Sequence, residues 1–159
     1  MELAAFDLPT FLRSATREVF DTMLSMGLEE DLKAERLFQD VSRVVGSVSL
    51  AGKVSGTVNI HVSEMFARLI TANMLGMEVA QVENEEEIHD VIGELSNMIG
   101  GDLKSRLCDA GFACNLSIPA ITAGKDFSIE AKGWAVNERV IFKFEEHTAL
   151  IEAFIKNGS

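Results

Sequence analysis

The segment from residue 83 to residue 110 carries the longest helical pattern in this chain, and it constrains the fold more than any other feature. Apolar residues recur along it at spacings of three and four, which places them on one side of a helix. These residues are Ile88, Val91, Ile92, Leu95, Ile99 and Leu103. Acidic residues fill the first turn from Glu85 to Glu87, where the helix dipole favours negative charge, and Gly111 provides a stop. The pattern predicts a long helix that packs its apolar side against a core.

A shorter helical pattern lies near the start of the chain. Apolar residues recur at helical spacing after Pro9 and Thr10, and Gly27 follows as a stop, which predicts a helix over residues 10–26. Residues 28–40 are rich in charged side chains, and we expect them to form a solvated connection or a short additional helix.

A hairpin and a second helix are predicted between these two helices. Two β-rich runs, 41–50 and 54–62, flank a short loop that contains glycine. Ser63 then stands where a cap is needed for a helix over residues 64–75, and Gly76 stands where that helix would end.

Four further runs follow the long helix, and each alternates or stays apolar between turn residues. They cover residues 115–121, 127–134, 138–145 and 149–155. They predict three or four antiparallel strands. The order of helix, two strands, two helices and further strands predicts an α+β fold, with long helices packed on one face of a mostly antiparallel sheet.

Length and charge limit the partners of the chain. A length of 159 residues fits one domain over residues 1–159, and the 47% of hydrophobic and 25% of charged residues are typical of globular proteins. The formal net charge is −11, from 25 acidic and 14 basic residues, and no cluster of Lys or Arg interrupts it. Nucleic acids and anionic membranes would be repelled, so we expect a protein with a cationic patch or a small ligand as partner.

The cysteines and histidines do not predict a metal site. Cys108 and Cys114 match no zinc spacing and are expected to be small core residues, and His61, His89 and His147 lie far apart in the sequence. The first residues show no basic stretch followed by an apolar one, and no run reaches 18 apolar residues. We therefore expect the protein to stay in the cytoplasm.

A polar stripe is predicted on the side of the long helix opposite its apolar residues. It consists of Asp90, Glu94, Asn97 and Gly101, which fall within roughly 60° of one another on a helical wheel. A solvated face is the simplest interpretation, but Asn97 is a poor helix former and Gly93, Gly100 and Gly101 each cost about 1 kcal/mol relative to Ala. We expect Gly93 and Gly100, on the flank of the stripe, to let a neighbouring helix approach, and Gly101 to let a partner approach the backbone.

The stripe resembles the motif of the CheC/CheX/FliY family of response-regulator phosphatases. That motif has Asp or Ser, three residues, Glu, two residues, Asn and, about twenty-one residues later, Pro; Asp90, Glu94, Asn97 and Pro119 match it. The string Gly-Glu-Leu-Ser-Asn-Met-Ile-Gly-Gly and the earlier string Ala-Thr-Arg-Glu-Val-Phe-Asp-Thr-Met are similar to the CheX branch. The resemblance thus covers most of the chain.

The resemblance implies a duplicated, CheC-like fold and a phosphatase that acts on the phosphoaspartate of a CheY-like response regulator. It implies that Asn97 orients the attacking water, that Glu94 pairs with a lysine of the receiver domain, and that Asp90 and Gly101 contact the partner. Mg²⁺ would come from the receiver, so the chain would need no metal or other cofactor of its own. An Asp in place of Asn97 would bring negative charge to the phosphoryl group.

A fainter copy of the motif is present in the first predicted helix. Ser14, Glu18 and Asp21 repeat the spacing, with Asp in place of Asn and no Pro after it. Family members with two sites carry one in each such helix, so this copy resembles a degenerate second site. A chance polar face explains it equally well.

Two other functions remain open. One is a non-catalytic module that binds a response regulator or joins a flagellar switch. The other is a small-ligand enzyme that uses Glu94 as acid or base, which we rank lower because no Ser/His/Asp arrangement or second paired carboxylate accompanies it.

Association of two copies is also expected. The resemblance to CheX-type proteins implies that two copies pair through strands of their sheets. The apolar run 149–155 would form an edge strand that is liable to pair in this way. The sequence therefore predicts a homodimer.

Overall fold

The structure of the chain, a computed structural model, describes residues 1–34, 37–125, 127–129 and 136–158. Within these ranges the α-helices are α1 (Leu8–Leu24), α2 (Glu64–Leu75) and α3 (Glu85–Asp109), and two 3-10 turns cover Leu3–Ala5 and Val79–Gln81. The strands are β1 (Glu29–Glu30), β2 (Arg43–Gly52), β3 (Val54–Ser63), β4 (Cys114–Leu116), β5 (Ala120–Gly124), β6 (Val136–Phe144) and β7 (His147–Asn157). No helix in the described part of the chain is both long enough and apolar enough to cross a membrane.

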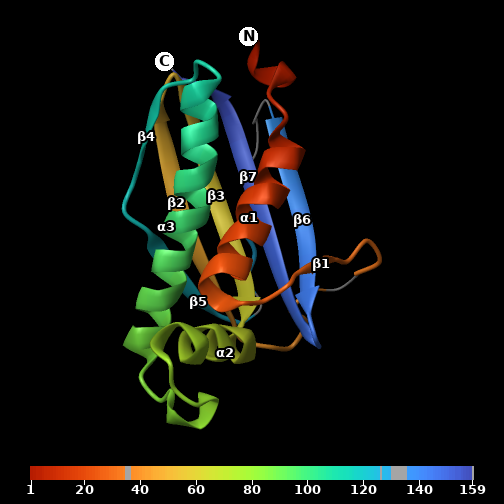
Figure 1. Cartoon of the computed structure of the whole chain (residues 1–159), viewed down its shortest axis with the longest axis vertical. Helices are drawn as coiled ribbons and strands as arrows, with labels where there is room; N and C mark the ends of the chain where they lie inside the picture. The colour runs from red at the N-terminus through yellow and green to blue at the C-terminus, as the bar shows by residue number, and fades with distance from the viewer. Residues whose placement is uncertain (35–36, 126, 130–135, 159) are drawn as a thin grey trace.

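The strands form one sheet in which every pair is antiparallel. The order is β1–β6–β7–β3–β2–β4, and β5 pairs with β2 on the same side as β4. The helices α1 and α3 lie side by side on one face of the sheet, and α2 lies across its end (Figure 1). The prediction of an α+β fold with helices on one face of an antiparallel sheet is confirmed.

The prediction that residues 149–155 form an edge strand is wrong. These residues belong to β7, which pairs with β6 on one side and with β3 on the other. An apolar run is equally typical of a central strand that is covered on both faces, and here six of the residues 149–155 are buried. A homodimer would therefore have to form through a different surface.

The order of the strands is symmetric about the pairing of β3 with β7. Each half of the chain supplies a helix followed by a long hairpin: α1 precedes β2 and β3, and α3 precedes β6 and β7. The helices then pack crosswise, because α3 lies mainly on β2 while α1 lies on β6 and β7. This exchange between halves is the arrangement expected of a duplicated fold.

Helix boundaries follow the capping residues. α1 starts two residues before its predicted position because Asp7 caps it, accepting a hydrogen bond from the Thr10 N–H at 3.3 Å. It also ends two residues early, at Leu24, because Ser25 adopts a left-handed conformation (φ 54°), and so Gly27 lies beyond the helix. The predicted helix over residues 64–75 is confirmed, with the Ser63 side chain accepting from the Phe66 N–H at 3.1 Å.

The strand predictions are confirmed in part. The hairpin of β2 and β3 and the pair of β6 and β7 are present, but the run 115–121 is split at Pro119, which cannot donate to a ladder, into β4 and β5. Residues 127–129 form no strand, and the rest of the predicted run 127–134 lies outside the described residues. In the described part of 28–40 the regular structure is β1, rather than an additional helix.

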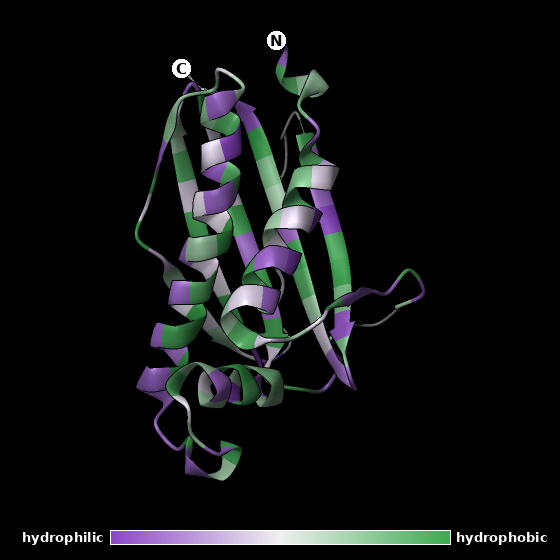
Figure 2. Cartoon of the chain, in the orientation of Figure 1, coloured by the Kyte–Doolittle hydropathy of each residue, from purple (hydrophilic) through white to green (hydrophobic). Residues whose placement is uncertain are grey.

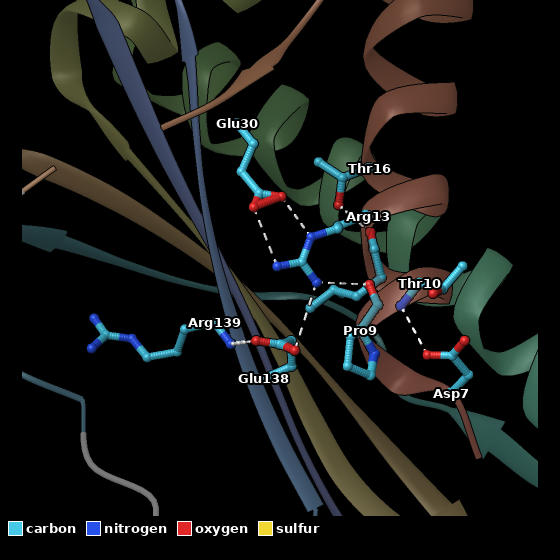
Figure 3. A network of polar contacts seen from close by, with 9 residues as sticks. Asp7, Pro9, Thr10, Arg13, Thr16, Glu30, Glu138 and Arg139 are labelled. Atoms are coloured by element: carbon cyan, nitrogen blue, oxygen red, sulfur yellow. Dashed lines mark hydrogen bonds and ion pairs between the residues drawn. The ribbon is translucent and has the colours of Figure 1, made fainter. Parts of the chain in front are cut away.

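Arg13 joins α1 to the edge of the sheet (Figure 3). Its guanidinium donates to both carboxylate oxygens of Glu30 in β1, at 2.6 and 3.3 Å, and lies 3.6 Å from the carboxylate of Glu138 in β6. It also donates to the Pro9 carbonyl at 3.2 Å. The bidentate hydrogen bond from Arg13 lowers the pKa of Glu30. One arginine thereby fixes the start of α1 against two strands.

The main core lies between the helices and the sheet, where buried hydrophobic residues from both pack together. Hydrophobic residues recur along the strands and the helices (Figure 2). The opposite face of the sheet carries a buried polar cluster of Asn59, His61 and Glu152. The same Glu152 oxygen accepts hydrogen bonds from Nε2 of His61 at 2.8 Å and from Asn59 at 3.2 Å. Nδ1 of His61 faces an N–H of Arg43 at 3.2 Å, so it acts as the acceptor and Nε2 carries the hydrogen.

Aromatic rings cover this buried polar cluster. The guanidinium of Arg43 lies 5.5 Å from the ring centre of Phe38 and 4.1 Å from that of Phe127, and the Phe38 ring stacks on His61. Arg43 also donates to the Phe127 carbonyl. Two connecting segments are thus held on the face of the sheet that the helices leave open.

Removing the carboxylate of Glu152 should destabilise the fold strongly. In the Glu152→Ala variant, His61 and Asn59 lose their acceptor inside the protein, so we expect the free energy of unfolding to fall by about 3 kcal/mol in urea at neutral pH. Glu29→Ala is the control: Glu29 is exposed and 3.9 Å from Lys143, and its loss should cost about 0.5 kcal/mol or less.

The same variant should show a defined pH dependence. Burial acts to raise the pKa of Glu152, but hydrogen bonds from His61 and Asn59 and the charge of Arg139 outweigh it, and the pKa is lowered from its ordinary value of 4.5. The stability contributed by ionisation is therefore complete above pH 4.5 and is lost as the pH falls through the folded-state pKa. A difference between Glu152→Ala and the unmodified protein that stayed constant on acidification would contradict this assignment.

Candidate functional site

Two contacts without room for a side chain hold α3 on the sheet. A Cβ on Gly46 of β2 would overlap Oγ of Ser96, which is fully buried and donates to the Ile92 carbonyl at 2.7 Å. One turn further along α3, a Cβ on Gly100 would lie 2.5 Å from Cγ2 of Val48. These contacts fix both the distance of α3 from β2 and its rotation about its own axis.

Gly46 and Ser96 were not identified from the sequence as positioning residues. Their signals were weak: one glycine within an apolar strand, and one serine on the apolar side of a helix. Neither pattern indicates which residue of α3 packs against which residue of β2.

The polar stripe lies on the side of α3 that faces away from the sheet. The six apolar residues of the predicted core side are all buried, whereas Asp90 and Glu94 are exposed and Asn97 and Gly101 are half-buried. Hydrophilic residues recur along the outward side of α3 in Figure 2. Among the described residues, none makes a hydrogen bond or ion pair with the side chains of Asp90, Glu94 or Asn97. The four residues therefore form one surface whose polar groups are available to a partner.

The flank of this stripe contacts strands rather than a helix, so the expectation of a close neighbouring helix is wrong. A Cβ on Gly93 would lie 3.5 Å from Cγ of Pro119, and a Cβ on Gly100 would lie 3.4 Å from Cδ1 of Leu116. The segment that joins β4 to β5 thus runs along α3 from Gly100 to Gly93. Pro119 has a structural place in this segment, because its ring packs beside Gly93.

The second copy of the motif has a different environment. Ser14 is half-buried on α1, and Glu18 and Asp21 are exposed. Nη2 of Arg106, on α3, lies 4.0 Å from Oε2 of Glu18, at ion-pair distance. Glu18 therefore has a cation from its own chain beside it, which Glu94 lacks among the described residues.

The cysteines and histidines do not gather at the stripe. Cys108 and Cys114 are free thiols, Cys114 is buried as predicted, and burial raises the pKa of Cys114 to about 11, so it stays protonated. His61 belongs to the buried polar cluster, and His147 stacks on Phe66 with ring centres 5.0 Å apart. His89 lies half-buried near the start of α3.

One group with metal-ligand geometry occurs in the described ranges, at the turn between β6 and β7. Ligand atoms of Glu145, Glu146 and His147 lie within 4.8 Å of one another, and both glutamates are exposed. The group contains no residue of α3. Exposed acidic clusters of this kind are common without a metal.

Comparisons with known proteins show the family of this chain. A family model described as chemotaxis phosphatase CheX matches residues 44–145, which include the polar stripe and Pro119. The CheY-P phosphatase CheX of Thermotoga maritima is 28% identical over 116 residues, covering 72% of this chain and 73% of that protein.

Solved structures share the fold over nearly the whole chain. The crystal structure of chemotaxis protein CheX from Vibrio vulnificus is 28% identical with a TM-score of 0.77, covering 95% of this chain and 99% of its own. A complex of CheX, CheY, BeF3 and Mg²⁺ from Borrelia burgdorferi is 22% identical with a TM-score of 0.75, covering 96% of this chain and 99% of the matched chain.

The fold and the family match define a phosphatase that acts on response regulators. More closely, the chain belongs to the chemotaxis phosphatase CheX family. The family resemblance drawn from the sequence is confirmed.

Adjacent glycines of α3 should respond oppositely to the same substitution. Gly101→Ala should raise the free energy of unfolding by about 1 kcal/mol, because nothing lies within 4 Å of the new Cβ and Ala favours helix. Gly100→Ala should lower the free energy of unfolding by about 1 kcal/mol in total, even though Ala favours helix here as well. The reason is that the new Cβ would press on buried Val48, whose χ1 is stiff. Urea denaturation of the two variants provides the measurement, and a shift of both in the same direction would refute the proposed seating of α3.

Proposed function

We propose that this protein hydrolyses the aspartyl phosphate of a CheY-like response regulator by docking α3 against the receiver domain, with Asn97 orienting the attacking water. The observation that carries the proposal is the stripe of exposed Asp90 and Glu94 and half-buried Asn97, whose side chains make no hydrogen bond or ion pair among the described residues. The named activity of the Thermotoga relative and the CheX–CheY complex from Borrelia support the choice of substrate.

The proposed reaction is an in-line displacement at phosphorus. The water oxygen forms a new bond to phosphorus as the bond from phosphorus to the aspartate oxygen breaks. The aspartate leaves with the bonding electron pair as a carboxylate, and the protons of the water go to the inorganic phosphate and to solvent. Little covalent chemistry is required of the enzyme, so catalysis consists mainly of positioning and charge stabilisation.

Asn97 suits the positioning of water. Its carboxamide oxygen can accept a hydrogen bond from the water while its NH₂ group donates elsewhere, and it carries no charge that would repel the phosphoryl group. Because Asn does not titrate, its role is to orient the water rather than to remove a proton. A divalent cation and a lysine that neutralise the phosphoryl oxygens belong, in this proposal, to the receiver.

Glu94 suits docking. It lies one turn before Asn97 and is exposed, so its carboxylate can form an ion pair with a lysine of the receiver. The net charge of −11 favours a partner with a cationic surface, and Asp90, a further turn away, would lie at the rim. Gly101 leaves the helix backbone open to approach.

The copy on α1 is proposed to be inactive. Asp21 stands where Asn97 stands in the other copy, and its carboxylate would repel the phosphoryl group. Glu18 already lies at ion-pair distance from Arg106, so a receiver lysine would have to compete with it.

A non-catalytic adaptor is the alternative. Such a protein would bind a phosphorylated receiver or a flagellar switch through the same stripe without accelerating hydrolysis. The rate of phosphate loss from the receiver with and without this protein separates the two functions.

Substitutions one turn apart should have different kinetic effects. Asn97→Ala should lower kcat by about 10²-fold or more while the affinity for a beryllofluoride-activated receiver changes little, because water placement is lost and the docking surface is kept. Glu94→Ala should raise KM and weaken that affinity, because an interface charge pair is lost. The measurement is the decay of labelled aspartyl phosphate on the receiver with each variant in catalytic amount.

Asp21→Ala is the matched control, because it alters the same motif position in the copy on α1. It should leave both kcat and KM unchanged. If Asn97→Ala accelerates decay as well as the unmodified protein does, the stripe is a solvated face and this assignment fails.

We also propose that two copies of the chain associate through β6. Among the described residues, β1 pairs with Phe142 and Lys143 and the Asp31 N–H donates to the Ile141 carbonyl, so the part of β6 that precedes Ile141 has no strand partner on its outer side. Unpaired backbone of this kind readily adds a strand from another chain. Light scattering at micromolar concentration should give twice the mass of the chain, and a monomer mass throughout that range would contradict the dimer.

A further inference from the structure

Ile118 is the most exposed large apolar residue of the described chain, with 88% of its surface accessible to solvent. It lies in the segment that joins β4 to β5 and runs along the flank of α3. Single apolar residues on a surface are common and usually need no explanation. Ile118 differs from such residues because it lies near the polar stripe and because its backbone is fixed on both sides.

The backbone on both sides of Ile118 is fixed. On one side, the Ser117 N–H donates to the Ser49 carbonyl at 2.9 Å, and the Ser49 N–H donates to Oγ of Ser117 at 2.8 Å. On the other side, Pro119 packs beside Gly93. A residue that precedes proline is also restricted to extended conformations. Ile118 is therefore held in place in the folded chain.

The segment lies beside Asn97. Leu116 lies beside Gly100 and Pro119 lies beside Gly93. Residues 117 and 118 therefore pass the two turns of α3, from Gly93 to Gly100, that contain Asn97. At 100° per residue, Asn97 is the member of the stripe nearest to this glycine flank. Ile118 thus lies in the segment that passes the turns of α3 carrying Asn97, the residue assigned to water placement.

We propose that Ile118 is a docking residue for the phosphorylated receiver, which covers it when α3 engages. The inference rests on the proposed function and adds a requirement for the partner: an apolar surface adjoining its phosphoaspartate. Continuity with the stripe identifies the receiver as the occupant, because a protein close enough for Asn97 to reach the phosphoryl group also covers the neighbouring segment.

The chemistry of Ile118 suits this role. A β-branched side chain on a fixed backbone loses little conformational freedom on binding, so most of the gain from its burial is retained. Together with Glu94 it would give the interface an apolar contact beside a charged one, which is the usual arrangement of a specific protein surface.

The test compares Ile118→Ser with Leu32→Ser. Leu32 is 86% exposed and lies near β1, at the opposite edge of the sheet from β4, so it is a matched control. The probe is a CheY-like receiver from the same organism, activated with beryllofluoride for binding and phosphorylated for kinetics. Ile118→Ser should raise Kd and KM about tenfold, or about 1.4 kcal/mol, with kcat within about twofold of the unmodified value.

Two further measurements define the outcome. Ile118→Val should raise KM less, by about fourfold, because only one methylene is removed. Leu32→Ser should change neither constant. The thermal midpoints of all three variants should stay within about 2 °C of the unmodified protein, because neither side chain is buried.

Failure of this inference is distinguishable from failure of the proposed function. If Ile118→Ser binds the activated receiver as tightly as the unmodified protein while Asn97→Ala loses activity, Ile118 is not a docking residue and the phosphatase assignment stands. If Ile118→Ser lowers kcat without changing Kd, the docking role is equally refuted. Full activity of Asn97→Ala overturns the proposed function itself.

Discussion

The seating of α3 on β2 determines the geometry of the whole candidate site. The side chains of Asp90, Glu94 and Asn97 make no hydrogen bond or ion pair with the described chain, so their positions follow mainly from the helix that carries them. That helix is fixed by Gly46 against Ser96 and by Gly100 against Val48, contacts that leave no space for slippage. Close-packed interiors do not deform continuously, so a helix held in this way presents its outer face as a rigid surface. Reactions that depend on placing a water require that rigidity.

The helix that provides this rigidity contains residues with low intrinsic helix propensity. Gly93, Gly100 and Gly101 each lower helix propensity by about 1 kcal/mol relative to Ala, yet α3 is continuous from Glu85 to Asp109. Packing on the sheet and the acidic first turn offset the loss. Packing accounts for Gly100, which has no room beside Val48, and for Gly93, which lies beside Pro119. At Gly101 nothing lies within 4 Å, and disagreement between local preference and fold is expected there if function selects the residue.

The local parts of the structure were predictable from the sequence, and the parts that depend on distant residues were not. The stripe on α3 follows from a spacing of 3.6 residues per turn, so a helical wheel was sufficient to group Asp90, Glu94 and Asn97. The central position of β7 was not predictable, because an apolar run does not identify its neighbours. Likewise, the contact of His61 with Glu152 joins residues 91 positions apart, and nothing in their local sequences indicates it. The flank of the stripe was misassigned to a helix for the same reason.

The central pairing of β3 with β7 also has a consequence for how the chain acquires its fold during synthesis. The strand that completes the middle of the sheet comprises residues 147–157, so the first hairpin has one side of β3 without its partner until that segment has left the ribosome. The crosswise packing extends the delay to α1, because β6 and β7, the strands that it covers, are translated well after it. Folding is then governed by contacts between distant parts of the sequence, which form slowly and leave apolar strands exposed in the meantime. The nascent chain therefore exposes one side of β3 until β7 is inserted beside it.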